Sequence, residues 1–326
     1  MRELVVEWRE RFDWRAQEAR INRFRQFKIP LAGIELHFIH EPGRSPHAMP
    51  LLISHGWPGS IVEFLALIPL LTEHFTVVAP SLPGYTLSFT PGQPRFGTEE
   101  IAECYAGLMA RLGYERYGVQ GGDWGAFLGS RLAARYAERV IGLHLNLLAV
   151  RRDPKIPATS PEEGEYLRQL AHWLKQETGY QAIQGTKPQT LAYGLTDSPV
   201  GLAAWIVEKF RAWSDCGGDV ERSIDRDTLL TNVMLYWVTG AINSSFWPYY
   251  ARTHSPWPIT DKRPVTAPAA YASFPKEILH PPRAWVSRVY TDLRRWTEMK
   301  AGGHFAALEQ PAALAEDVRA FFRTFR

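Results

Sequence analysis

The sequence has few cysteines, only Cys104 and Cys216 among 326 residues. Two cysteines do not make the disulfide framework of a small secreted protein, so we expect a reducing compartment and a cytoplasmic location. Long apolar runs are also absent, since no stretch approaches the roughly 20 apolar residues that span a bilayer. Residues 1–25 carry Arg and Glu throughout, unlike a secretory signal. We therefore expect no membrane anchor.

The chain also lacks an excess of charge of either sign. Its 37 Lys and Arg nearly match its 34 Asp and Glu, the net charge is +3, and the basic residues are spread over the whole chain. We therefore expect no nucleic-acid partner. No metal-ligand spacing and no phosphate-binding loop is found, so we expect no metal and no cofactor. Aromatic residues are frequent, at 13% with 12 Trp, which suits an apolar pocket or an aromatic core.

Residues 1–150 alternate short apolar runs with helical patterns, one of which predicts a helix over 61–71. The apolar runs at 51–54, 75–79 and 140–148 are unbroken, as in strands buried on both faces. Such strands, alternating with helices, indicate a mostly parallel sheet covered by helices, the α/β class. Residues 1–30 differ, because Trp and Phe are mixed there with many Arg and Glu. This amphipathic helical pattern predicts an N-terminal arm packed on the main body.

The pattern changes between residues 151 and 247. Helical segments dominate there, Gly and Pro separate them, and no apolar strand of the buried type is found. We interpret 151–247 as a helical lid inserted into the sheet domain. Strand patterns return at 265–272 and 295–299 before a last helix. Residues 248–326 are thus predicted to complete the core that 1–150 begins.

The segment Gly121-Gly-Asp-Trp-Gly125 has the form Gly-x-nucleophile-x-Gly. An apolar strand precedes it and a helix-forming run follows, the context that holds a nucleophile in a strained turn above a sheet. Small neighbours are needed because a Cβ does not fit such a turn. Asp123 occupies the nucleophile position, which indicates attack on a saturated carbon through an ester intermediate. The alternative is that Asp123 only caps the next helix.

A nucleophile on such an elbow is followed along the chain by an acid and then by a His. His304 is the best candidate for the base, because it follows a late strand and two glycines and precedes the last helix. The acid is expected just after the preceding strand, which favours Glu277. Asp261 and Asp292 are the competing carboxylates.

The oxyanion of the ester's hydrolysis needs hydrogen-bond donors. The segment His55-Gly-Trp-Pro58 lies at the end of an early strand, where one backbone N–H of an oxyanion hole originates; the residue after the nucleophile supplies the other. The predicted donors are the backbone amides of Trp57 and Trp124. Their side chains are expected to contact the substrate, or else to belong to the core.

Six segments share a family pattern, and they occur in its order: His55-Gly-Trp-Pro-Gly-Ser60, Gly121-Gly-Asp-Trp-Gly125, Thr186-Lys-Pro-Gln-Thr190, Asp197-Ser-Pro-Val-Gly-Leu-Ala203, Leu229-Leu-Thr-Asn-Val-Met-Leu-Tyr-Trp237 and Gly302-Gly-His-Phe-Ala-Ala307. They resemble the microsomal and juvenile-hormone type of epoxide hydrolase, over nearly the whole chain. The resemblance implies an α/β-hydrolase fold with an inserted lid. The N-terminus departs from the pattern, because the membrane anchor of the microsomal members has no counterpart.

The resemblance also implies that two lid tyrosines hold and protonate the epoxide oxygen. One lies shortly before the Thr-Lys-Pro segment and corresponds to Tyr180. The other follows Ser244-Ser245, and the spacing favours Tyr249, with Tyr250 as the alternative and a further substrate contact. Pro248 departs from the pattern just before this pair and affects which ring faces the pocket.

The implied reaction converts a small apolar epoxide and water into a vicinal diol. Asp123 attacks an epoxide carbon, and water activated by His304 and Glu277 then hydrolyses the ester. Two alternatives stay open: a haloalkane dehalogenase, which also uses an elbow Asp followed by Trp, and a non-catalytic, ligand-binding relative. No pattern determines the oligomeric state, and a homodimer is compatible with the sequence.

Overall fold

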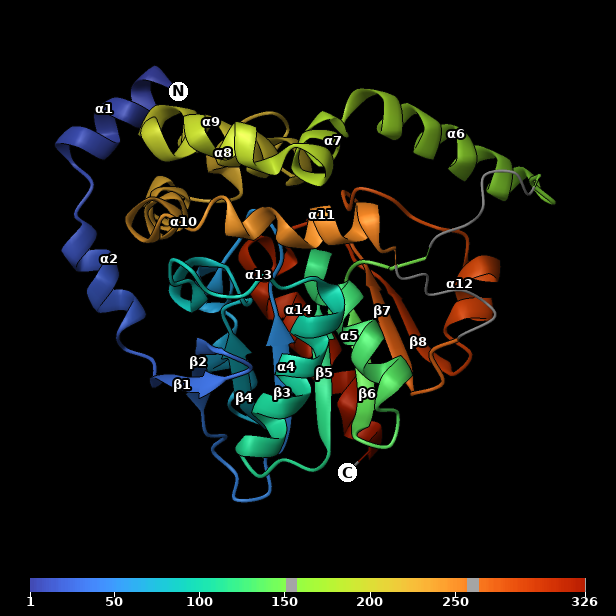
Figure 1. The fold of residues 1–326 in the computed structure, drawn as a ribbon. Helices are drawn as coiled ribbons and strands as arrows, with labels where there is room; N and C mark the ends of the chain where they lie inside the picture. The colour runs from blue at the N-terminus through green and yellow to red at the C-terminus, as the bar shows by residue number, and fades with distance from the viewer. Residues whose placement is uncertain (151–156, 257–263, 326) are drawn as a thin grey trace.

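The computed structural model describes residues 1–150, 157–256 and 264–325. One eight-stranded sheet forms its centre, in the order β1-β2-β4-β3-β5-β6-β7-β8 (Figure 1). β1 and β2 pair antiparallel, β2 also pairs antiparallel with β4, and the strands from β4 to β8 are parallel. The strands are β1 (Gln26–Leu31), β2 (Ile34–Glu41), β3 (Met49–Ser54), β4 (Phe75–Pro80), β5 (Tyr117–Gly121), β6 (Val140–Leu145), β7 (Ala269–Ser273) and β8 (Leu293–Glu298).

The central strands are apolar on both faces because both faces are covered. Leu51 and Ile53 of β3 belong to one buried cluster, and Leu52 between them belongs to another, as the alternation of side chains in a strand requires. The cluster of Leu52 includes residues of α4 (Thr98–Arg111) and α5 (Asp123–Arg135). The other cluster includes α3 (Ile68–Leu71) and α14 (Pro311–Phe322). Figure 1 shows α4 and α5 in front of the sheet and α14 behind it. The α/β class is confirmed.

A layer of helices lies above the edge where β3 and β5 end (Figure 1). It is inserted between β6 and β7 and consists of α6 (Pro161–Gln176), α7 (Gly179–Thr186), α8 (Pro188–Asp197), α9 (Pro199–Trp213), α10 (Arg226–Thr239) and α11 (Trp247–His254). The predicted lid boundary at residue 247 falls at the start of α11, so helix continues beyond it to His254. The other predicted boundary, at residue 151, lies outside the described residues.

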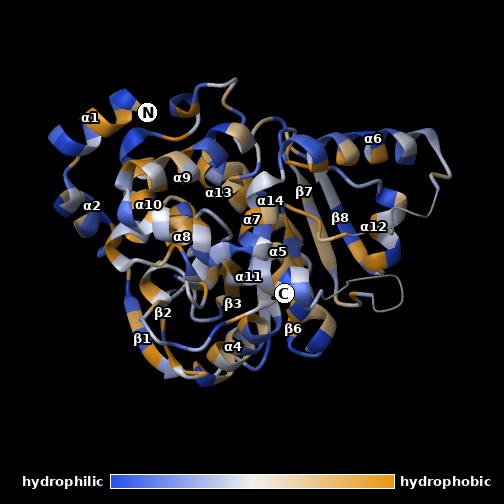
Figure 2. Ribbon diagram, turned by 45° about the horizontal axis from the view of Figure 1, so that its top comes forward, coloured by the Kyte–Doolittle hydropathy of each residue, from blue (hydrophilic) through white to orange (hydrophobic). Residues whose placement is uncertain are grey.

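The N-terminal arm contains α1 (Arg2–Glu10) and α2 (Trp14–Ile21) and lies beside α10 of the lid (Figure 1). Gln17 donates a hydrogen bond to Asp227 at 3.3 Å. Polar and apolar residues alternate along α1, as they do along α6 (Figure 2). None of the described helices is long and apolar enough to cross a membrane.

Three elements differ from the sequence expectation. The single helix expected over 61–71 is a 3-10 turn, Ile61–Phe64, followed by the short α3. Pro69 lies in the first turn of α3, and a proline inside one long helix would remove a hydrogen bond. The strand expected over 265–272 is β7, which begins at Ala269, and β1 was not expected at all. β1 was not predicted because it is an edge strand whose side chains are exposed or half-buried, so its sequence has no long apolar run.

Candidate active site

Asp123 lies at the turn between β5 and α5 with a φ of 46°. This left-handed conformation is strained for a residue with a Cβ. A Cβ on Gly121 would lie 2.4 Å from the Gly125 carbonyl, and one on Gly125 would lie 2.0 Å from the Ser54 oxygen. Both glycines are therefore required by the close approach of backbone. The capping residue of α5 is Gly122, and the Asp123 carboxylate is not used as a helix cap.

The loops after β7 and β8 bring Glu277 and His304 to Asp123. His304 Nδ1 lies 2.7 Å from Glu277 Oε1, and Nε2 lies 3.4 Å from Asp123 Oδ2. His304 and Glu277, which make these two contacts, are both buried. Asp292 instead pairs with Arg294. The remaining competitor, Asp261, lies outside the described residues.

The two carboxylates determine the charge of the imidazole. Burial works to lower the pKa of His304, but Glu277 and Asp123 outweigh it and hold that pKa well above its usual range. The Nδ1 proton is expected to face Glu277, which leaves Nε2 directed at Asp123. Loss of the Asp123 charge would remove part of this support and lower the pKa of His304, so that the neutral imidazole becomes available to accept a proton.

The backbone amide of Trp57 donates to Asp123 Oδ1 at 2.8 Å. This hydrogen bond holds Oδ1 in place, while the other carboxylate oxygen, Oδ2, faces His304 Nε2. The amide of Trp124 lies in the first turn of α5, where backbone N–H groups have no partner within the helix. The Trp57 amide thus contacts the carboxylate directly, whereas the Trp124 amide is placed only by following Asp123 in the chain.

Tyr180 of α7 and Tyr249 of α11 lie above the elbow, 5% and 3% exposed, with ring centroids 5.8 Å apart. The ring of Trp57 stacks on Tyr180 at 5.3 Å, and the Trp124 ring meets the Tyr249 ring at 4.8 Å. Burial raises the pKa of both hydroxyls, and the negative charge of Asp123 raises them further. The tyrosines are therefore held as neutral hydrogen-bond donors.

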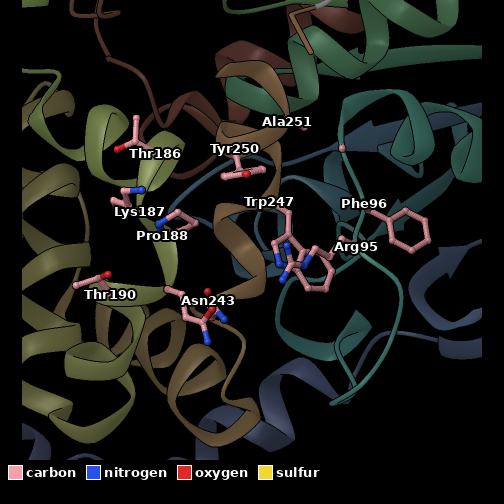
Figure 3. Close-up of a pocket in the computed structure, with 12 residues that line it drawn as sticks. Arg95, Phe96, Thr186, Lys187, Pro188, Thr190, Asn243, Trp247, Tyr250 and Ala251 are labelled. Atoms are coloured by element: carbon pink, nitrogen blue, oxygen red, sulfur yellow. The ribbon is translucent and has the colours of Figure 1, made fainter. Parts of the chain in front are cut away.

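The structure does not bring Tyr250 into this group. Its side chain is 39% exposed and stacks on His254 with ring centroids 3.9 Å apart. It lines a different, surface cavity of about 400 Å³ with Lys187 and Trp247 (Figure 3). Successive helical residues point about 100° apart, so α11 directs Tyr249 inward and Tyr250 outward. The prediction of a substrate contact for Tyr250 is corrected accordingly.

A cavity of about 340 Å³ separates the lid from the core beside Asp123 and Tyr180. Its other walls are mostly apolar: Phe127, Leu147, Leu148, Val150, Tyr166, Leu170, Trp173, Leu174, Gln181, Arg252, Ile278, Leu279 and Pro281. Sequence reasoning missed the α6 wall, although residues 166, 170, 173 and 174 follow helical spacing. That spacing indicates one apolar face but not what covers it. Over residues 1–150, 157–256 and 264–325, no group of three His, Cys, Asp or Glu is placed to hold a metal ion.

Comparisons with known proteins agree with this geometry. Residues 1–64 match the family "Epoxide hydrolase N terminus", and residues 49–192 match the "alpha/beta hydrolase fold". A putative epoxide hydrolase of Stigmatella aurantiaca is 42% identical over 99% of this chain and 75% of its own length. Epoxide hydrolase 1 of Sus scrofa is 38% identical over 98% of this chain and 79% of its own.

A solved structure agrees over the full length. The crystal structure of juvenile hormone epoxide hydrolase from the silkworm Bombyx mori superposes with a TM-score of 0.89 at 33% identity. The superposition covers 99% of this chain and 84% of the silkworm chain, so it includes arm, core and lid. The chain therefore belongs to the epoxide hydrolases that have the α/β-hydrolase fold, hydrolases acting on ether bonds.

Proposed function

We propose that Asp123, His304, Glu277, Tyr180 and Tyr249 carry out epoxide hydrolysis on a small apolar epoxide. One observation carries the proposal: the Asp123 carboxylate contacts a buried His–Glu pair and lines the same cavity as the buried Tyr180, whose ring lies beside that of Tyr249. A hydrolysis through an ester needs these two sets of groups, a base for water and donors for the epoxide oxygen. The apolar cavity of about 340 Å³ suits an apolar substrate.

In the first stage Asp123 Oδ2 attacks an epoxide carbon while the Trp57 amide holds Oδ1. The carbon–oxygen bond of the ring breaks, and the leaving oxygen takes a proton from Tyr180 or Tyr249. Their raised pKa keeps both protons in place until the alkoxide develops. The product of this stage is a hydroxyalkyl ester of Asp123.

In the second stage water attacks the carboxyl carbon of that ester. His304 Nε2 takes one proton from the water, and the amides of Trp57 and Trp124 hold the oxyanion. The acyl–oxygen bond then breaks, the diol oxygen takes the proton from His304, and Asp123 returns as a carboxylate. The second proton of the water restores the ionised tyrosine, so no proton is gained or lost.

A single turnover in water enriched in heavy oxygen tests this sequence. We expect the first diol to carry unlabelled oxygen and the label to enter Asp123, because the ester is cleaved at its acyl carbon. Asp123→Ala is expected to lose turnover. Label in the first diol, or full turnover by Asp123→Ala, would exclude Asp123 as the nucleophile. Halide release from a chloroalkane without diol formation from styrene oxide would favour the dehalogenase instead.

A cytoplasmic location is also part of the proposal. Both cysteines, Cys104 and Cys216, are buried free thiols, which is compatible with a reducing compartment. Fractionation of the source cells, with the protein detected by antibody, tests this location. Detection in a membrane fraction would contradict it.

A further inference from the structure

Glu63 is a carboxylate next to the reaction centre that the proposed mechanism does not use. It follows the His55-Gly-Trp-Pro segment in a 3-10 turn, and its carboxylate accepts a hydrogen bond from the backbone of Gly56 in that segment. A Cβ on Gly59 would lie 1.5 Å from Glu63 Oε1, so the glycine leaves the space that the carboxylate occupies. Glu63 is thereby packed onto the loop that carries the Trp57 amide.

Glu63 lines a second, much smaller cavity on another side of Asp123. This cavity measures about 20 Å³, and a water molecule needs at least about 10–15 Å³. Its wall includes His304 and Gly122, and Asp123 is the one residue that it shares with the large apolar cavity. Substrate and water can therefore approach the Asp123 carboxyl group from separate spaces.

His304 Nε2 has no hydrogen-bond partner among the described residues, although it is buried. Its contact with Asp123 Oδ2 at 3.4 Å involves the oxygen that the ester consumes. A water in the small cavity can donate one proton to Nε2 and needs an acceptor for its other O–H. Asn146 Oδ1 already accepts from Gln120 at 2.9 Å. Gln120 Oε1 also lacks a partner on this wall, but Glu63 is the remaining carboxylate besides Asp123, and an ionised carboxylate is a stronger acceptor than an amide oxygen.

The charge of Glu63 depends on the state of Asp123. Burial raises the pKa of Glu63 to about 8; His304 lowers it and the Asp123 carboxylate raises it. Esterification neutralises Asp123, so Glu63 ionises more easily at the stage when His304 takes up a proton. The nearby His55 and Tyr236 stay neutral, because burial lowers the pKa of His55 to about 4 and raises that of Tyr236.

We propose that the small cavity holds the hydrolytic water and that Glu63 is the positioning residue that accepts its second hydrogen bond. The proposal rests on the proposed function. One O–H bond of the water breaks toward His304 Nε2 while the new bond forms at the Asp123 carboxyl carbon. Glu63 orients the water and, when ionised, stabilises the imidazolium. The proton then leaves on the diol, so Glu63 ends the cycle unchanged.

The variant Glu63→Gln tests the proposal. Rapid-quench single turnover with styrene oxide measures ester formation and ester hydrolysis separately. We expect ester formation within about twofold of the original rate and ester hydrolysis slower on the order of 10- to 100-fold. The intact mass of the enzyme should show accumulated ester, and kcat and KM should fall together. Glu63→Asp, which keeps the charge, should restore part of the hydrolysis rate.

Glu138→Gln is the matched control, since its side chain is 71% exposed, and it should change neither stage. Unchanged hydrolysis in Glu63→Gln, or an equal loss in both stages, overturns the proposal. If Glu63→Gln does not fold, Glu63→Asp tests the proposal through the same comparison of the rates of ester formation and ester hydrolysis. If the unaltered enzyme forms no ester, the proposed function fails first; if it does and Glu63→Gln hydrolyses it normally, only the inference fails.

Discussion

At the scale of single residues, Trp57 contributes to the site through both its backbone and its ring. Its amide donates to Asp123 Oδ1, and its ring stacks on Tyr180 and meets the edge of Tyr249. The nucleophile and the tyrosines are therefore positioned by the same buried residue. Trp57 is fully buried, and a shift of its position would move both sets of groups relative to each other.

Tyr180→Phe and Tyr249→Phe are each expected to slow ester formation by about 10²-fold, since each removes a proton donor and leaves the ring in place. Ester hydrolysis should change little. Stopped-flow tryptophan fluorescence can follow the first stage, because Trp57 and Trp124 contact these rings.

Tyr250→Phe is the matched control for this pair, because its ring lies outside the site, and both stages should keep their rates. An equal loss of ester formation in Tyr250→Phe would show that the hydroxyl assignment is wrong.

At the scale of elements, a buried carboxylate of α14 links this helix to two strands of the sheet, in addition to its apolar contacts. Asp317 contacts His144 of β6 at 3.0 Å, and it accepts from Arg295 and Thr297 of β8, each at 2.7 Å. Burial works to raise the pKa of Asp317, but these three partners outweigh burial and hold the pKa well below its usual value. The helix is thus locked to the half of the sheet that carries Glu277 and His304.

Asp317→Asn should lower the free energy of unfolding at pH 7 by about 3 kcal/mol, because it leaves buried partners without their charge. The folded-state pKa is lowered, so this stabilisation is present above the unfolded pKa of about 3.9 and is lost as pH falls below it.

Urea unfolding at pH 7 and at acid pH tests this direction. The difference in free energy of unfolding between the unaltered protein and Asp317→Asn should become smaller in acid. Glu316→Gln, on the exposed side of α14, should show no such gap. A gap that widens in acid would contradict the assigned direction.

At the scale of the whole molecule, the arm joins the lid to the sheet domain. Gln17 and Arg20 reach α10 through Asp227 and Thr228, while Ile21 is buried in the cluster that contains α14. α1, in contrast, has no buried residue. The two helices of the arm therefore contribute unequally to stability.

Removal of residues 2–12, which takes away α1 with the partly buried Leu4 and Trp8, should lower the free energy of unfolding by about 1–2 kcal/mol. Removal of residues 2–22 should cost about 2–3 kcal/mol more, because Ile21 leaves the core. Thermal unfolding of both truncated proteins measures the difference. Equal losses of unfolding free energy in the two truncated proteins would show that α1, and not α2, makes the stabilising contacts.

Local features of the sequence determined the α/β-hydrolase fold and the family, and both predictions are confirmed. The elbow could be predicted because its strain arises within five residues, and only glycine satisfies it at Gly121 and Gly125. The buried parallel strands could be predicted because both of their faces are apolar. Chain order then pointed to Glu277 and His304, which the structure brings within 2.7 Å of each other.

The tertiary structure alone decided what depends on the rotation of an element or on contacts between distant segments. Tyr249 and Tyr250 are adjacent and chemically identical; the family resemblance favoured Tyr249, but only the packing of α11 places its ring against Trp124 while Tyr250 stacks on His254. Glu63 lies in an ordinary turn of the sequence and gains its place beside His304 from the folding of separate loops. Sequence patterns report which face of an element is buried, whereas the neighbours across that face are chosen by the whole fold.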